Sequence, residues 1–292
     1  MEVSLGGLEP VALIVIGLSA GMAGGLLGIG GSLVIIPALT ELLGPDQHLY
    51  QSAAMMVNFF VAIPAVIHHR RVGAVEQATV RRIIPIAVSA VVAGVLVSES
   101  SLFAGRYEMY LLGLFGMFLF CVSGLEFRRV SWRNRSTTPS PNETPDKPTE
   151  NAKIVLALPL SWRTAVAVAV PTGFVAGLLG VGGGVLAVPL QRHFLNIPLR
   201  TAIANSSAII IATSLVGAVV KNHHYLIEHD HSLRSFALAG MLIPSAMLGS
   251  MVGSRLTHQL PIRHLKTAFL LFLLLAAMRL TYAAARSALT GG

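Results

Sequence analysis

Long apolar runs without charge dominate the pattern of this chain. No Asp, Glu, Lys or Arg occurs in seven intervals, which are 10–40, 47–69, 83–98, 109–125, 164–191, 201–220 and 235–254. An eighth apolar run, 265–285, is interrupted by Lys266 and Arg279. Because about 20 apolar residues let a helix cross the hydrocarbon core of a bilayer, the pattern predicts an all-α integral membrane protein with about eight transmembrane segments.

Composition supports this class. Of the 292 residues, 54% are hydrophobic and only 12% are charged, whereas soluble domains carry about 25% charged residues. The net charge is +8, but the basic residues lie between the apolar runs, so we assign them to orientation in a lipid bilayer and not to nucleic acid. The acidic start MEVSLGGLEP argues against a cleaved signal peptide.

One stretch departs from the apolar pattern. Residues 128–162 contain RRVSWRNRSTTPSPNETPDKP, which has too little apolar surface to offset the entropy lost on ordering. We therefore expect a solvated, cytoplasmic linker at 128–162 between a first membrane repeat, 1–127, and a second, 163–292.

The two predicted halves share an internal repeat. GMAGGLLGIGGSLVIIPAL begins at Gly21 and GFVAGLLGVGGGVLAVPL at Gly173. Further matches pair Asn58 with Asn205, Pro85 with Pro244, and Gly94 with Gly253. Gly-rich helices can resemble each other by composition alone, but ordered matches over such a length favour duplication. Secondary transporters are often duplicated in this way, with the substrate site between the repeats.

The glycine phrases do not suit a nucleotide loop. A P-loop needs a lysine after G-x-x-x-x-G, and Gly31 and Gly183 stand where it would be. A dinucleotide loop needs a sixth-position glycine, where the second phrase has Val185. Two roles in a membrane remain.

One role is close helix packing, which glycines four residues apart allow, and we assign Gly17, Gly21 and Gly173 to it. The other is a broken helix, because glycine weakens a helix by about 1 kcal/mol relative to alanine. The predicted breaks are Gly28, Gly30 and Gly31 in the first half and Gly180, Gly182, Gly183 and Gly184 in the second.

The length of the first segment in each half leaves two topologies open. A straight helix through 10–40 or 164–191 would exceed a core of about 30 Å by half. If all eight segments cross, the halves are parallel; if the first segment of each half is re-entrant, the halves are inverted. Both satisfy the positive-inside rule, and we favour inverted halves because they support alternating access.

Uncharged polar groups are the candidate ligands within the segments. The charge-free intervals lack carboxylates, which disfavours a carboxylate relay or an intramembrane enzyme. We expect backbone N–H groups at the breaks to bind a small anion with the side chains of Ser32, Asn58, Asn205, Ser206 and Ser207. The alternative is interhelical hydrogen bonding, which we favour for Thr213 and Ser214.

The ten histidines do not predict a metal site. HHYLIEHDH, from His223 to His231, lacks an established ligand spacing and is interpreted as a solvated loop. His68 and His69 occupy the comparable place in the first half, so a pH-sensitive gate at both exits is a further hypothesis. No metal or organic cofactor is expected.

The doubled glycine phrases, the four-plus-four segments and the polar second spans AAMMVNFF and AIANSSAI resemble the sulfite exporter TauE/SafE family of membrane transporters. The resemblance covers nearly the whole chain except the linker. It implies a multi-pass permease of a bacterial-type inner (plasma) membrane that moves small sulfur-containing anions such as sulfite or organosulfonates. One departure is Ser32, where the second copy has Gly184. The first copy is also less polar after its asparagine, with Phe59 and Phe60 opposite Ser206 and Ser207, which suggests that the second half supplies more of the binding donors.

The expected function is therefore transport of a small anion between the two repeats. The alternatives are a permease for another small anion and a scaffold or sensor without transport. The exact substrate, its direction, the coupling ion and the oligomeric state, a homo-oligomer included, stay open.

Overall fold

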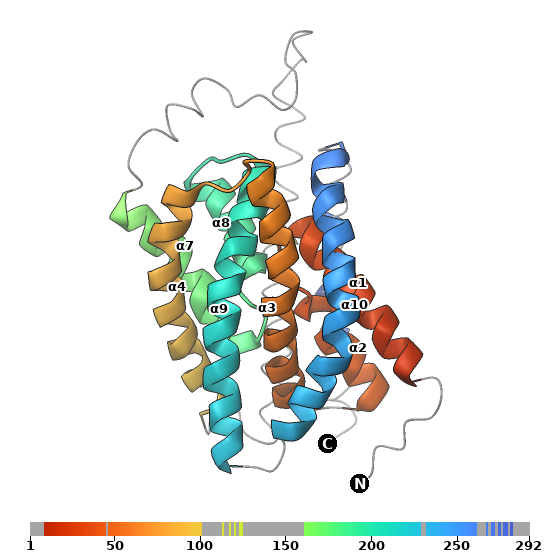
Figure 1. The fold of residues 1–292 in the computed structure, drawn as a ribbon. Coiled ribbons are helices and arrows are strands. Elements are labelled where there is room, and N and C mark those ends of the chain that lie inside the picture. The colour runs from red at the N-terminus through yellow and green to blue at the C-terminus, as the bar shows by residue number, and fades with distance from the viewer. Residues whose placement is uncertain are drawn as a thin grey trace.

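The computed structural model describes residues 9–44, 46–100, 161–228 and 232–261, with a few single residues in 113–124 and 267–282. The elements within these ranges are helices (Figure 1). In chain order they are α1 (Glu9–Leu27), α2 (Ser32–Leu43), α3 (Gln47–Arg71), α4 (Gln77–Ser98), α7 (Trp162–Leu179), α8 (Gly184–Phe194), α9 (Leu199–Glu228) and α10 (Ser232–Gln259).

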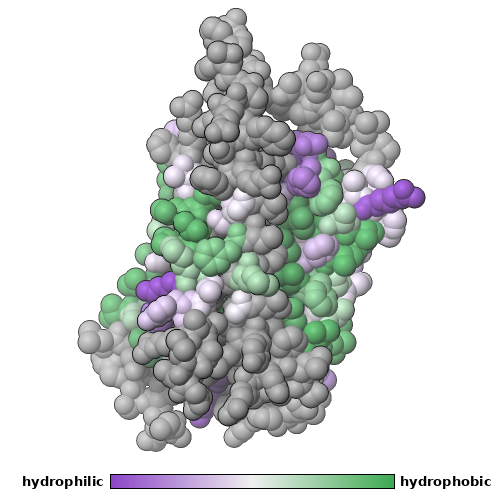
Figure 2. Space-filling view, turned by 180° about the vertical axis from the view of Figure 1, so that it is seen from behind, coloured by the Kyte–Doolittle hydropathy of each residue, from purple (hydrophilic) through white to green (hydrophobic). Residues whose placement is uncertain are grey.

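The predicted all-α membrane architecture is confirmed. Six of the described helices, α1, α3, α4, α7, α9 and α10, are long and apolar enough to cross a membrane. Their outer surfaces are apolar: Val11, Ile14 and Val15 of α1 are each more than half exposed, and hydrophobic side chains cover broad parts of the described surface (Figure 2). The predicted segments 109–125 and 265–285 fall mostly outside the described residues, as does the linker 128–162 apart from its last two positions.

Both predicted helix breaks are present. The first separates α1 from α2, with Gly28 at φ 64° and Gly30 at φ 80°. The second separates α7 from α8, where Gly180, Gly182 and Gly183 have φ of 69°, 71° and 86°. These left-handed angles favour glycine over any residue with a Cβ, so the phrase determines where the helix stops.

The chain reverses direction at each break. A Cβ added at Gly31 would lie 3.2 Å from Cβ of Ala20, so α2 starts beside the middle of α1. In the same way, a Cβ at Gly183 would lie 3.1 Å from Cγ2 of Thr172 in α7. Each of the two pairs, α1–α2 and α7–α8, is therefore a helical hairpin, which is the re-entrant alternative.

Glycine stripes join each hairpin to the fourth helix of the other half. On α1, a methyl group at Gly21 would overlap the carbonyl oxygen of Ala246 in α10. On α7, a methyl group at Gly173 would overlap the carbonyl oxygen of Ala87 in α4. Gly17 is equally close to Ser245. The predicted packing role of Gly17, Gly21 and Gly173 is confirmed, since only glycine lets these backbones approach so closely.

The directions of the helices show that the two halves are inverted. α1 runs parallel to α10, because Gly17 faces Leu242 and Gly25 faces Ser254. α3 also runs parallel to α10, since Ser250 Oγ donates to Val61 O and His258 contacts His69 further along both helices.

In the other half, α7 runs parallel to α4, because Gly173 and Gly177 face Ala87 and Val91 in turn. The central pair α3 and α9 is antiparallel: Gln51 near the start of α3 bonds Lys221 near the end of α9. α1 and α7 therefore begin at opposite ends of the molecule (Figure 1).

Candidate functional site

The two helix breaks meet each other inside the molecule. A methyl group at Gly184 would overlap the carbonyl oxygen of Gly28 and lie 2.7 Å from Cα of Ile29. A Cβ at Gly182 would lie 2.9 Å from Nδ2 of Asn58, in the middle of α3. The predicted glycines of both halves thus form one centre between α3 and α9.

Each break packs against the central helix of the other half. Gly28 lies against Ile203 of α9, and Gly180 lies against Gln51 of α3. Gly28 and Gly180 are 152 positions apart in the sequence, and so are their partners Gln51 and Ile203. This register defines which residues of α3 and α9 are equivalent.

Asn58 caps the first break. Its Oδ1 accepts hydrogen bonds from Gly31 N at 2.6 Å and Ser32 N at 3.1 Å, and its Nδ2 donates to Ser32 Oγ at 3.0 Å. Asn58 and Ser32 are fully buried. The first N–H groups of α2, which would otherwise lack partners, are therefore satisfied from within the protein.

The second break has donors in excess. Gly183, which precedes α8, has no side chain to cap the helix, and no described side chain accepts a hydrogen bond from the N–H groups of Gly184, Val185 or Leu186. Two buried residues with hydroxyl groups lie beside it: Ser214 Oγ is 2.7 Å from the Cβ position of Gly182, and Thr172 contacts Gly183 through its methyl Cγ2 and its carbonyl oxygen. Neither hydroxyl has a hydrogen-bond partner among the described residues. A helix N-terminus with such donors suits an anion.

Asn205 lies away from the centre. Its Oδ1 accepts a hydrogen bond from Glu76 N at 2.8 Å, beyond the end of α3. The expected equivalence of Asn58 and Asn205 is wrong, because in the register of the breaks Asn58 corresponds to Ile210, which packs against Gly184. Matching by residue type shifted the alignment by more than one helical turn.

The other predicted side chains connect backbone segments. Ser206 Oγ donates to Gly28 O across the two halves, whereas Ser207 Oγ donates to Ile203 O of its own helix at 3.0 Å. Thr213 Oγ1 donates to Gly182 O at 2.8 Å and so helps to fix the second break. From the sequence, Ser214 was assigned to interhelical hydrogen bonding, but its hydroxyl has no hydrogen-bond partner among the described residues. Thr172 was not singled out from the sequence.

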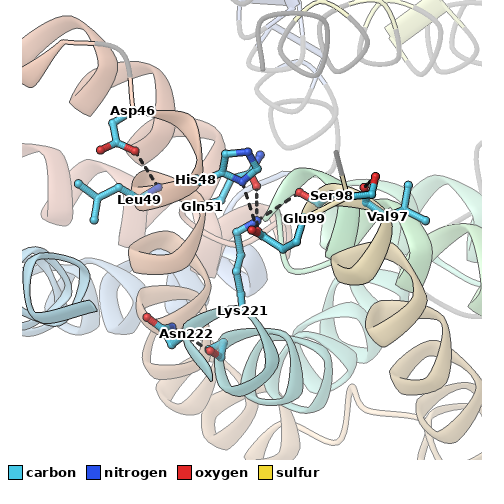
Figure 3. A network of polar contacts seen from close by, with 11 residues as sticks. Asp46, His48, Leu49, Gln51, Val97, Ser98, Glu99, Lys221 and Asn222 are labelled. Carbon is cyan, nitrogen blue, oxygen red and sulfur yellow. Dashed lines mark hydrogen bonds and ion pairs between the residues drawn. The ribbon is translucent and has the colours of Figure 1, made fainter. Parts of the chain in front are cut away.

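A buried ion pair lies near the second break (Figure 3). Lys221 is fully buried, and its Nζ lies 2.6 Å from Glu99 Oε1 and donates to Gln51 Oε1 at 2.7 Å. His48 Nδ1 lies 3.2 Å from the same carboxylate oxygen. Burial acts to raise the pKa of Glu99, but the hydrogen bond from His48 and the charge of Lys221 lower it to about 2.

The charge-free interval 201–220 stops before Lys221, but α9 continues to Glu228. A cavity of about 520 Å³ lies elsewhere, between the α1–α2 hairpin and Leu275 and Arg279. Gly182 and Gly184 are in close contact with their neighbours, so the structure has the two breaks closed on each other.

Comparison with known proteins places the chain in a family. The model of the sulfite exporter TauE/SafE family matches residues 13–280. The chain belongs to the sulfite exporter TauE/SafE family. The family resemblance given by the glycine phrases is thereby confirmed. No solved structure matches the chain.

Several curated relatives of this TauE/SafE protein are named as transporters. The probable membrane transporter protein MamO of Paramagnetospirillum magneticum is 28% identical over 271 residues, which cover 89% of this chain and 42% of MamO. The chain therefore spans about two fifths of that relative. The probable membrane transporter protein YunE of Bacillus subtilis is 26% identical, with 93% of this chain and 97% of YunE covered.

A third relative is also named as a probable membrane transporter. The probable membrane transporter protein MJ0441 of Methanocaldococcus jannaschii is 23% identical, with 87% of this chain and 88% of the relative covered. Together, the family match and the six apolar helices identify a multi-pass membrane protein.

Proposed function

We propose that this TauE/SafE protein is a permease of the cell inner membrane that moves a small sulfur-containing anion, such as sulfite or an organosulfonate. The anion would bind at the second break, between the repeats that we infer for 1–127 and 163–292. The observation that carries the proposal is the uncapped start of α8 beside the buried, unpartnered hydroxyls of Ser214 and Thr172.

The chemistry of these donors suits a substrate that must be released again. Backbone N–H groups and the positive end of the α8 dipole attract an anion, and the two hydroxyls can each donate one hydrogen bond. An anion held by neutral donors keeps its charge without forming a tight ion pair. An oxyanion offers the several acceptors that such a set requires.

The two breaks would then have different tasks. Asn58 already occupies the N–H groups of Gly31 and Ser32, so the first break forms a preorganised wall of the site. The second break supplies the donors, which agrees with the expectation that the second half contributes more of them. Of the other predicted residues, Ser206 would hold the breaks together, while Ser207 and Asn205 would have structural roles.

The closed contact of the breaks implies movement during transport. Gly184 and Gly28 are in close contact, so the hairpins must separate to admit a substrate. Hairpins packed on helices of the opposite half can move with either half, as alternating access in inverted repeats requires. Exchange of substrate would therefore follow a shift of α1–α2 against α7–α8.

The charges indicate an orientation. Arginines gather at the end where α3 and α8 finish: Arg70, Arg71, Arg81, Arg82, Arg192, Arg200 and Arg255. Among the described residues, the opposite end carries fewer basic residues, such as Lys221 and Arg234. By the positive-inside rule, we infer that the arginine-rich end and the linker lie in the cytoplasm.

Uptake into proteoliposomes tests the proposal. The parent protein should move labelled sulfite, thiosulfate or a small sulfonate. Ser214→Ala should reduce uptake at low substrate concentration at least about tenfold, because one hydrogen bond to a charged group contributes about 1.5–3 kcal/mol. Ser207→Ala is the matched control, since Ser207 bonds only its own helix, and it should transport like the parent.

Other outcomes would decide against the proposal. Flux of inorganic cations without anion flux would contradict the substrate class. Equal loss of uptake in Ser214→Ala and Ser207→Ala would remove the second break as the binding site. Absence of flux for every anion, with a folded protein, would favour the scaffold or sensor alternative.

A further inference from the structure

The two ends of the molecule carry polar pairs at equivalent positions. In the register of α3 and α9, His69 corresponds to Lys221. α4 and α10 are related by a second register. It is set by Gly94, which contacts α7, and Gly253, which contacts α1 in the same way. In this register Glu99 corresponds to His258. At one end Lys221 pairs with Glu99, and at the other His69 Nδ1 lies 2.8 Å from His258 Nε2. We call these the lysine pair and the histidine pair.

The neighbours of the two pairs also correspond. His48, beside Glu99, is equivalent to Arg200 in the register of α3 and α9. Arg200 donates through Nε to Thr257 O at 3.2 Å and through Nη2 to Leu260 O at 3.0 Å. The lysine pair thus joins α9 to the end of α4, and the histidine pair joins α3 to the end of α10. The two pairs are equivalent locks, by which we mean contacts that hold these helices together at opposite ends of the molecule.

We propose that the histidine pair is a proton-binding site that keeps its end of the transport path closed while neutral and opens it when protonated. The inference rests on the proposed function, because it identifies the proton as the ion that controls access to the same site. The lysine pair is its insensitive counterpart at the opposite end.

The two pairs differ in how they respond to added protons, as a gate at one end only requires. A short N···N contact between neutral imidazoles needs one ring as donor and the other as acceptor. A first added proton leaves a buried cation, and a second makes both facing nitrogens donors, so the contact is lost. In the lysine pair, burial acts to raise the pKa of Glu99, but the hydrogen bond from His48 and the charge of Lys221 lower it to about 2. This value lies far below the range in which histidine ordinarily titrates.

The surroundings of the histidine pair oppose a positive charge. His69 is fully buried, and the ring of His68 lies 5.6 Å from that of His258. Arg71 on α3 and Arg255 on α10 act on this cluster electrostatically, and Arg200 of α9 lies at the end of α10. Glu76 in the α3–α4 loop is an acidic group of these surroundings, and its N–H donates to Asn205. Burial raises the pKa of the Glu76 carboxyl, which weakens its ability to balance a positive charge.

The histidine pair is also connected to the first break. Thr257 precedes His258, and its Oγ1 donates to Leu26 O at 2.8 Å and Gly25 O at 3.2 Å at the end of α1. If protonation releases the end of α10 from α3, the end of α1 loses its fixed partner as well. The α1–α2 hairpin could then move away from the second break.

Matched cysteines at the two ends test the proposal without any substrate. Val66 and Ala218 are equivalent buried residues, three positions before His69 and Lys221. Each is replaced by cysteine in a Cys121→Ser background, which removes the single native cysteine. Labelling of purified protein by a water-soluble thiosulfonate reagent is followed from pH 8 to pH 5.5, with rates normalised to the same thiol in unfolded protein.

At Val66→Cys the normalised rate should rise at least about tenfold on acidification, because each of the two protons bound preferentially by the open state shifts a two-state equilibrium by up to about tenfold per pH unit. At Ala218→Cys it should not rise. The response at Val66→Cys should disappear when His69→Gln and His258→Gln are combined, since amides retain hydrogen bonding but do not titrate. If that variant does not fold, His69→Lys with His258→Glu, a copy of the lysine pair, serves the same purpose.

An acid response that survives these replacements, or one of equal size at Ala218→Cys, would overturn the proposal. Thiosulfate uptake under an imposed pH gradient separates it from the proposed function. Anion flux with no histidine-dependent labelling response refutes the gate alone. A histidine-dependent response in a protein without anion flux supports the gate and refutes the anion permease.

Discussion

At the scale of single residues, Asn58 shows how a break inside a membrane protein is stabilised. A buried N–H group without a partner costs about 1–3 kcal/mol, and Asn58 Oδ1 serves two of them. Asn58→Ala should therefore lower the free energy of unfolding by about 2–4 kcal/mol. Asn205→Ala is the control and should cost less, because Asn205 Oδ1 accepts one backbone bond. Thermal unfolding in detergent measures both, and an equal effect would contradict the capping role.

Residue type alone predicted the glycines of the breaks but not the polar residues around them. Gly28 and Gly180 could be found because a left-handed turn in an apolar helix nearly requires glycine. Asn205 was misplaced because similar residues on two helices do not reveal the register in which those helices pack. Ser214 was assigned to interhelical hydrogen bonding because only the folded structure shows that Gly182 approaches its hydroxyl.

At the scale of helices, the glycine stripes carry a stability prediction. Gly173→Ala should destabilise the protein by several kcal/mol, because its methyl group would overlap the backbone of α4 at Ala87. Gly240 lies within α10 with open space at its Cβ position, so Gly240→Ala should instead add up to about 1 kcal/mol of helix stability. Opposite shifts in melting temperature are expected; a loss of similar size in both would mean that the α4–α7 contact does not depend on glycine.

Helix positions followed from the apolar pattern, whereas their ends did not. The spans that became α3, α4 and α10 were predicted from charge-free runs, because a bilayer excludes unpaired charge from lipid-facing helices. The charge-free interval 201–220 ends before α9 does, because Lys221 interrupts the run of uncharged residues. The ion pair with Glu99 offsets the free-energy cost of burying the charge of Lys221. No local sequence pattern indicates a partner so distant along the chain.

At the scale of the whole molecule, inversion of the halves makes a prediction about sidedness. Leu43 at the end of α2 and Phe194 at the end of α8 finish equivalent hairpins, and both are exposed. If every first segment crossed the membrane, both would lie on the same side. In the structure the hairpins open toward opposite ends, so cysteines at the two positions should react from opposite sides.

Impermeant thiol labelling of intact cells and of inverted membrane vesicles, in a Cys121→Ser background, distinguishes the two arrangements. Leu43→Cys should be labelled from outside the cell, and Phe194→Cys only in inverted vesicles, since the positive-inside rule places the arginine-rich end in the cytoplasm. Val72→Cys, exposed at the end of α3, should behave like Phe194→Cys. Labelling of Leu43→Cys and Phe194→Cys from one side would contradict the inverted fold, and with it the equivalence of the lysine and histidine pairs as locks at opposite ends.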